Sequence, residues 1–430
     1  MMDTALAIFL VTYALLLAFP KFRAYIALCS AAVFVSLGIL PASRVLSSVD
    51  WNVILMIAGT MGVVYFFIES KMPSLLADII IEKMPDIKWA IISLALFAGI
   101  ISAFVDNVAT VLMVAPVALN ISKKLKISPV NSIIAISISS NLQGAATLVG
   151  DTTSILLGGY ANLDFLDFFV YRGKPGMFWV VQAGAIVSTF ALLYLFRKEK
   201  QEIRLDERTE VKDYFPSVLL SGTVVLLIMA SFIPEKPAIT NGIICMGLFV
   251  IGLIRAIIRE YFDSYDFKES IMVVTKALKE IDYFTLLLLG GLFVVIGGIT
   301  EAGVVDEISK LFVRICQNNV FLMYSILVWA SVLFSAFIDN IPYVATMLPV
   351  TAGIANIIGV DPTILYFGLL SGATLGGNLT PIGASANIAG LGILRKEGYE
   401  VKAGQFMKIS VPFTLAAVTA GYILIWLIWR

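Results

Sequence analysis

The chain repeats one polar motif in its two halves, and both copies lie inside apolar sequence. Residues 102–117 match residues 335–350 at 8 of 16 positions, including the pairs Asp106-Asn107 and Asp339-Asn340. The same spacing relates Gly144, Thr147, Gly150, Ile155 and Gly159 to Gly377, Thr380, Gly383, Ile388 and Gly392. A register shared over so long a stretch indicates duplication. Paired polar, helix-breaking segments in two apolar halves are typical of the binding site of a membrane transporter.

Composition supports a membrane location. Hydrophobic residues make up 59% of the chain and charged residues only 14%, whereas soluble domains contain about a quarter charged residues. The 30 basic residues balance the 30 acidic ones, so the net charge does not indicate a nucleic-acid partner. Three scattered cysteines and no histidine argue against a disulfide framework or a metal cluster. Any proton carrier must therefore be a carboxylate, and no organic cofactor is expected.

The lengths of the apolar runs predict an all-α polytopic membrane protein with about ten spans. Four runs are too long for one helix, which needs about 20 residues to cross a bilayer. Runs 89–122 and 320–360 carry Asp-Asn near the middle, which predicts two re-entrant hairpins with the polar pair at the tip. Runs 130–170 and 362–394 hold glycine, proline and hydroxyl residues, which predicts two broken helices.

Basic residues predict the orientation of these elements. With an external N-terminus and re-entrant hairpins, the predicted cytoplasmic stretches hold 22 of the 30 Lys and Arg residues and the external ones hold 6. The first repeat (1–196) then starts outside and the second (214–430) starts inside, joined by a charged cytoplasmic linker (197–213). We therefore predict inverted-topology repeats in the cell membrane, with both termini outside.

Three aspartates are the strongest candidates for a functional site. Asp106, Asp151 and Asp339 lie in apolar surroundings, where each bare carboxylate costs roughly 2.5–3.5 kcal/mol at the bilayer centre. A bound cation, a proton or dense hydrogen bonding must offset this cost. Oxygen ligands suit sodium, and the candidate sodium ligands are Asp106, Asn107, Asp151, Asp339 and Asn340. Further oxygens and amides nearby come from Asn141, Thr147, Thr152, Thr153, Ser154, Asn378, Thr380, Ser385 and Asn387.

Two alternatives remain open for these motifs. The Asp-Asn pairs, Asn107 and Asn340 in particular, could cap broken helices by accepting hydrogen bonds from unpaired amides. Helix N-termini brought to the membrane centre could also hold an anionic substrate once cations neutralise the carboxylates. Asp151 corresponds to Ala384, which favours a proton or cation near the site of the first repeat.

These paired motifs resemble the ArsB/NhaD-type permeases of the ion transporter superfamily, which includes arsenite efflux pumps, sodium/proton antiporters and the melanosomal P protein. The resemblance covers nearly the whole chain. It implies inverted repeats, a homodimer, and a transport domain that carries both hairpins in an elevator-like movement. It also implies ion binding at the acidic, hydroxyl-rich segments around Asp106, Asp151 and Asp339.

The leading functional prediction is a secondary transporter that exchanges sodium, or another small cation, for protons. The alternative is proton- or sodium-coupled transport of arsenite or another small oxyacid or anion, including carboxylates, and an ATPase partner is expected only for an arsenite pump. A passive channel would need a continuous pore rather than paired hairpins. An enzyme is not expected, because no nucleophile and base or metal set is evident.

Overall fold

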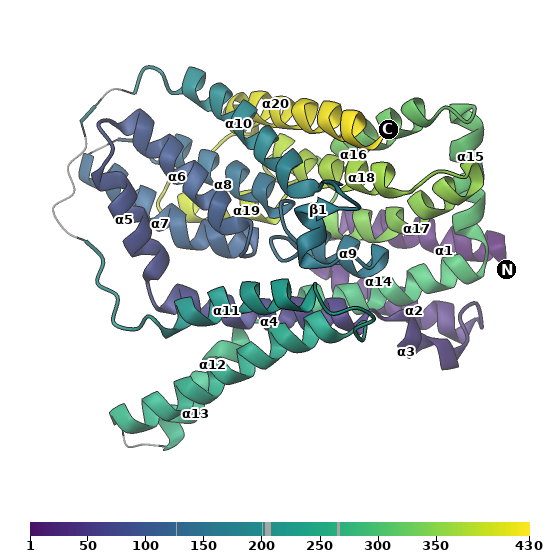
Figure 1. Ribbon diagram of the computed structural model, residues 1–430, viewed down its shortest axis with the longest axis horizontal. Helices are drawn as coiled ribbons and strands as arrows, with labels where there is room; N and C mark the ends of the chain where they lie inside the picture. The colour runs from purple at the N-terminus through teal and green to yellow at the C-terminus, as the bar shows by residue number, and fades with distance from the viewer. Residues whose placement is uncertain (126, 200, 203–207, 265–266) are drawn as a thin grey trace.

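The computed structural model describes residues 1–125, 127–199, 201–202, 208–264 and 267–430, and its helices run mostly along the long axis of the molecule (Figure 1). In the described part, strands β1 (Val170–Tyr171) and β2 (Lys174–Pro175) form one short antiparallel pair. The predicted all-α membrane fold is confirmed.

Seven described helices are long and apolar enough to cross a membrane, or up to nine spans if two bent pairs each count as one. The seven are α4 (Trp51–Glu69), α7 (Asn107–Leu125), α10 (Met177–Leu195), α12 (Thr240–Ser264), α14 (Tyr283–Glu301), α17 (Asn340–Ile358) and α20 (Ala403–Trp429). The bent pairs join α1 (Met2–Ala18) to α2 (Arg23–Ser36) through η1 (Pro20–Phe22), and α15 (Val304–Cys316) to α16 (Val320–Ser335). The expected number of about ten was slightly higher because α6 (Ile87–Ser102) and α11 (Phe215–Ala230), of 16 residues each, are shorter than a full span.

Six consecutive helices of the first half recur in the second half. The first residues of α4 to α9 recur as those of α14 to α19, either at the spacing that separates Asp106 from Asp339 or one position short of it. The other helices of these two sets, with the short η4 that follows α18, are α5 (Met72–Glu82), α8 (Val130–Gly144), α9 (Thr152–Ala161), α18 (Thr363–Gly376), η4 (Gly377–Leu379) and α19 (Ser385–Lys396). Even the N-caps match, because Asp50 and Asp282 each accept the amide three residues on, at 3.1 and 3.0 Å.

The two halves interlock through a pair of close helix contacts. α2 of the first half packs on α14 of the second, and α12 of the second packs on α4 of the first. A Cβ added to Gly59 would lie 2.4 Å from the carbonyl carbon of Cys245, and one added to Gly291 would lie 2.7 Å from that of Ala27. Only glycine allows the backbones to approach so closely, so this repeated glycine sets both contacts.

The two hairpins lie in opposite halves of the molecule along its long axis. The arms α6 and α7 occupy the left half of Figure 1, and α16 and α17 lie in the right half. Each hairpin packs its second arm on the broken helix of the other half, α7 on α19 and α17 on α9. This arrangement brings the two tips and the two helix breaks into one central region.

Connecting segments complete the chain: η2 (Ala42–Arg44), α3 (Val45–Ser48), η3 (Phe165–Phe168) and α13 (Phe267–Lys279). The predicted linker 197–213 includes residues 200 and 203–207, which lie outside the described residues. Its described end lies on α5, where the amide and hydroxyl of Thr209 donate to Asp78 Oδ2 at 2.8 and 2.6 Å. The repeat boundaries at 196 and 214 stay predictions.

Candidate functional site

The hairpin tips place one carboxylate at the start of each second arm. Asp106 Oδ2 accepts hydrogen bonds from the amides of Val108 and Ala109, at 2.9 and 3.1 Å. Asp339 Oδ1 accepts one from the amide of Ile341, at 3.1 Å. The capping role considered for the asparagines therefore belongs to the aspartates that precede them, because a short carboxylate at this position reaches the first unpaired amides of the helix.

Matching threonines fasten each helix break to the hairpin tip of its own half. The hydroxyl of Thr147 donates to the carbonyl of Ala103, and that of Thr380 donates to the carbonyl of Ala336. Gly150 lies so close to the first tip that an added Cβ would meet the carbonyl of Ser102 at 2.8 Å, and Gly383 repeats this contact in the second half. The repeated Thr and Gly thus hold backbone against backbone and are structural.

Buried amides and hydroxyls join the two halves. The Asn141 side chain accepts from Asn107 Nδ2 at 3.0 Å and donates to the carbonyl of Thr374 at 2.8 Å. Thr153 bonds to the Thr374 hydroxyl at 2.9 Å and to Asp151 Oδ2 at 2.8 Å. The Asn340 amide reaches the same Asp151 oxygen at 3.4 Å. Asp151 is therefore the point at which the second hairpin meets the first broken helix.

A cavity of about 210 Å³ lies beside this junction, between α4 and α7. Four carboxylates line it, from Asp106, Asp151, Glu280 and Asp282, and no Lys or Arg is among the described residues that line it. The cavity continues to the exposed side chains of Glu280 and Asp282, which connect it to one end of the molecule. An acidic cavity without basic residues attracts cations and repels bare anions.

The second tip carboxylate does not line this cavity. Asp339 Oδ2 instead lies 2.7 Å from Nη1 of Arg23, and both side chains are 16% exposed. The prediction that Asp339 joins one cation site with Asp106 is therefore not met in this conformation. Arg23 belongs to α2 of the first half. Because α2 packs on α14, and α14 packs on the hairpin arm α17, the ion pair depends on contacts between the two halves.

The 14 predicted site residues fall into two groups. Those that line the cavity are Asp106, Asn107, Asp151, Thr152, Asn340 and Ser385. Those that do not line it are Asn141, Thr147, Thr153, Ser154, Asp339, Asn378, Thr380 and Asn387. Ser154 donates to the carbonyl of Gly144 at 3.2 Å, and Asn378 donates to that of Ile138 at 2.8 Å. The Asn387 amide bridges the second break, donating to the carbonyls of Gly377 and Thr380, both at 3.2 Å.

Sequence reasoning missed the outer part of the cavity. Glu280 and Asp282 lie between α13 and α14, far from either motif in the chain. One signal was available, because Asp282 precedes an apolar run in the second half just as Asp50 does in the first. In the described residues no three His, Cys, Asp or Glu side chains cluster as a metal site would, so amide, hydroxyl or backbone oxygens would have to complete any cation shell.

Inverted repeats, paired hairpins and an acidic cavity beside two broken helices define an integral membrane transporter. A family model described as "Citrate transporter" (CitMHS) matches residues 13–372, and the chain belongs to this family. The resemblance to ion transporter superfamily permeases is thereby confirmed.

Relatives agree with this assignment over the whole length of the chain. An uncharacterized transporter of Mycobacterium tuberculosis is 30% identical over 434 residues, covering 98% of both chains. A 46 kDa membrane protein of Mycobacterium leprae is 29% identical over 438 residues, again covering 98% of each. The human P protein is 25% identical over 448 residues, which are 88% of this chain and 54% of that protein.

Two solved structures share the fold. The YdaH transporter of Alcanivorax borkumensis superposes with a TM-score of 0.59 at 13% identity, covering 94% of this chain and 96% of that one. MtrF of Neisseria gonorrhoeae superposes with a TM-score of 0.54 at 15% identity, covering 94% and 93%. At these identities the comparison establishes the arrangement of helices alone.

Proposed function

We propose that this chain is a secondary transporter that exchanges a small cation, sodium in the first instance, for protons across the cell membrane. The observation that carries the proposal is the cavity lined by Asp106, Asp151, Glu280 and Asp282 without a lining Lys or Arg among the described residues. A hard cation prefers such oxygen ligands, and Asn107, Asn340 and Thr152 add neutral ones. Carboxylates that exchange a cation for a proton also supply the coupling.

The proposed mechanism is alternating access by an elevator-like movement of the hairpins and broken helices. The inverted repeats support it, because each half can adopt the conformation that the other half has here. The close contacts at Gly59 and Gly291 support a rigid frame made of α2, α4, α12 and α14. We also propose that two such chains form a homodimer, as the resemblance to ArsB/NhaD-type permeases implies.

A carboxylate carried together with a cation is the second candidate. The family description favours it, and the N-termini of α7, α9, α17 and α19 all contribute residues to the cavity wall, where the positive ends of the helix dipoles suit an anion. The four carboxylates would repel bare citrate, so a cation must enter with it. Arsenite has no comparable support in the geometry.

Purified protein in liposomes separates these candidates. Under an imposed pH gradient, sodium uptake that requires protons on the opposite side supports antiport. Citrate uptake that requires a cation, together with no sodium flux when citrate is absent, would instead support the second candidate. Asp306→Asn, an exposed carboxylate on α15 outside the cavity, is the matched control for substitutions in the cavity.

A further inference from the structure

The two hairpin tips have the same sequence pattern but different charge partners. Asp339 is paired with Arg23 at 2.7 Å, whereas Asp106 faces the acidic cavity. Arg23 is held in place by a second hydrogen bond, from its Nε to the carbonyl of Leu16 in the last turn of α1, at 3.3 Å. The second tip thus has a fixed positive partner, whereas no Lys or Arg among the described residues lines the cavity that the first tip faces.

The duplication identifies the position that corresponds to Arg23 in the second half. The two glycine contacts align Ala27 of α2 with Cys245 of α12. One helical turn before these two residues stand Arg23 and Asn241, so Arg23 corresponds to Asn241, near the start of α12. Asn241 is buried but carries no charge of its own.

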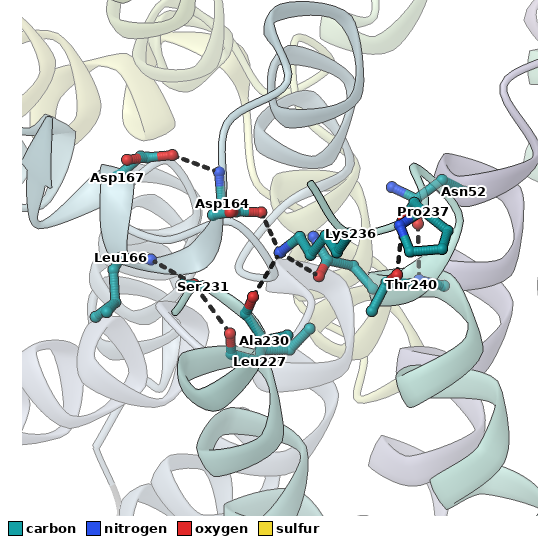
Figure 2. A network of polar contacts seen from close by, with 12 residues as sticks. Asn52, Asp164, Leu166, Asp167, Leu227, Ala230, Ser231, Lys236, Pro237 and Thr240 are labelled. Atoms are coloured by element: carbon teal, nitrogen blue, oxygen red, sulfur yellow. Dashed lines mark hydrogen bonds and ion pairs between the residues drawn. The ribbon is translucent and has the colours of Figure 1, made fainter. Parts of the chain in front are cut away.

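A lysine supplies the missing charge beside Asn241. Figure 2 shows Lys236, whose Nζ lies 2.5 Å from Asp164 Oδ1 and 3.1 Å from the carbonyl of Ala230. The same nitrogen lies 3.4 Å from Asn241 Oδ1, and the lysine side chain is only 13% exposed. Ala230 is the last residue of α11, so Lys236 and Arg23 both rest on carbonyls at the C-terminal turn of a helix, where cations are favoured.

Lys236 also lines a second cavity, of about 500 Å³, at the opposite end of α4. The first cavity touches α4 at residues 61–68, near its C-terminus. The second touches the N-cap Asp50 and Asn52. Asp50 is the repeat counterpart of Asp282, which lines the first cavity, so the two cavities share one pair of equivalent residues.

We propose that Arg23 and Lys236 are alternating counter-ions of the two hairpin-tip carboxylates. Arg23 neutralises Asp339 in the conformation described here, and Lys236 neutralises Asp106 when the cavity opens at the other end of α4. The inference rests on the proposed alternating-access function, because it requires the two halves to exchange conformations. The contact between Arg23 and Asp339 is then replaced by one beside Asn241, where Lys236 lies.

This exchange gives each tip a charge partner only while that tip does not face an open cavity. A carboxylate enclosed without a partner is strongly destabilising, so the enclosed tip needs a cation of the protein itself. The tip that faces the cavity is left to the transported cation. The transported cation therefore competes with a basic side chain for each tip aspartate in turn.

A cysteine pair reports the exchanged conformation and leaves the two tip aspartates, Arg23 and Lys236 in place, although it removes the hydrogen bond from the Thr285 hydroxyl to Asp282 Oδ2, 2.6 Å long. Here α9 packs on α4 so closely that a Cβ added to Gly159 would lie 2.5 Å from Val53 Cγ2. The repeat counterparts are Gly392 and Thr285, and Gly392 has no heavy atom within 4 Å of an added Cβ, so the equivalent contact is open. Thr285→Cys with Gly392→Cys should form a disulfide only after the exchange. The three native cysteines, Cys29, Cys245 and Cys316, are first replaced by alanine.

In the first experiment, oxidation forms this disulfide and so locks the protein in the exchanged conformation. The locked protein is then treated with a carbodiimide, which joins a lysine amine to an adjacent carboxylate. Mass spectrometry should find Lys236 joined to Asp106 in the locked protein and to Asp164 in the reduced protein. If Lys236 joins only Asp164 in the locked protein, or if the disulfide does not form under oxidation, the proposal is overturned.

The second experiment removes the other counter-ion. Arg23→Gln should raise the fraction of the disulfide between positions 285 and 392 at least about fivefold, a coupling of ordinary size, whereas Arg23→Lys should leave it nearly unchanged. Arg44→Gln, which removes an exposed pair with Glu301, is the control. An unchanged fraction in Arg23→Gln contradicts the proposal. If liposomes that contain the unsubstituted protein show no cation flux, the proposed function is contradicted, whatever the two crosslinks show.

Discussion

Asp106 is the residue whose charge matters most to the proposed function, because it both caps α7 and faces the cavity. Asp106→Asn keeps an oxygen for the amides of Val108 and Ala109, so the hairpin should fold. It removes a charge from the cation site, and sodium flux should fall by at least about tenfold, the equivalent of 1.4 kcal/mol. Flux in liposomes at matched protein density measures this. Normal flux, with Asp306→Asn as the control, would refute the role.

The pair of Arg23 and Asp339 should behave as one unit in stability. Either Arg23→Gln or Asp339→Asn leaves a mostly buried charge without its partner, so each should lower the melting temperature in detergent. The double substitution removes both charges and should cost less than the sum of the two, with a coupling of roughly 0.5–3 kcal/mol. Strict additivity would show that the contact contributes nothing.

The sequence could locate the residues that the duplication marks. Asp106, Asn107, Asp151, Thr152, Asn340 and Ser385 were predicted site residues, and all of them line the cavity. Arg23 could not be predicted as a partner of Asp339, since the two are 316 residues apart and meet only because α2 packs beside the second half. Glu280 was missed for the same reason. A motif search finds what is repeated, whereas ion pairs between halves depend on packing.

At the scale of elements, the repeated glycine should tolerate no side chain. Gly59→Ala or Gly291→Ala places a Cβ within 2.4 or 2.7 Å of the backbone of the facing helix. Backbone cannot give way as a flexible side chain can, so each change should destabilise by about 1–3 kcal/mol. Gly290→Ala is the matched control, because nothing lies within 4 Å of its added Cβ, and helix propensity should make it neutral or stabilising. Thermal unfolding followed by size-exclusion chromatography compares the three.

The elements themselves were largely predictable, but their caps were not. Length alone showed that runs 89–122 and 320–360 must turn back, and each hairpin does turn at its Asp-Asn pair, between α6 and α7 and between α16 and α17. Sequence left open which member of the pair caps the second arm. The choice depends on backbone geometry at the tip, where the aspartate precedes the first helical residue and its carboxylate reaches the amides beyond.

At the scale of the whole molecule, the inverted arrangement followed from duplication and the distribution of basic residues, but the open end did not. The two halves are too similar in sequence to indicate which one is closed. The asymmetry lies in packing, since α14 contacts α17 in the second half while the acidic cavity separates α4 from α7 in the first. Under the proposed exchange of conformations, the sequence encodes both states and cannot by itself indicate which one is populated.

Sided labelling of single cysteines tests this asymmetry and the predicted orientation together. Leu112→Cys places a thiol in the acidic cavity, where the native side chain is 49% exposed, and Ala238→Cys places one in the second cavity. With external termini, a membrane-impermeant thiol reagent should modify Leu112→Cys only in inside-out vesicles and Ala238→Cys only in right-side-out vesicles. The opposite pattern would invert the orientation while keeping the two cavities on opposite faces. Labelling of both from one side would contradict an arrangement in which the cavities serve the two membrane faces, and with it alternating access between them.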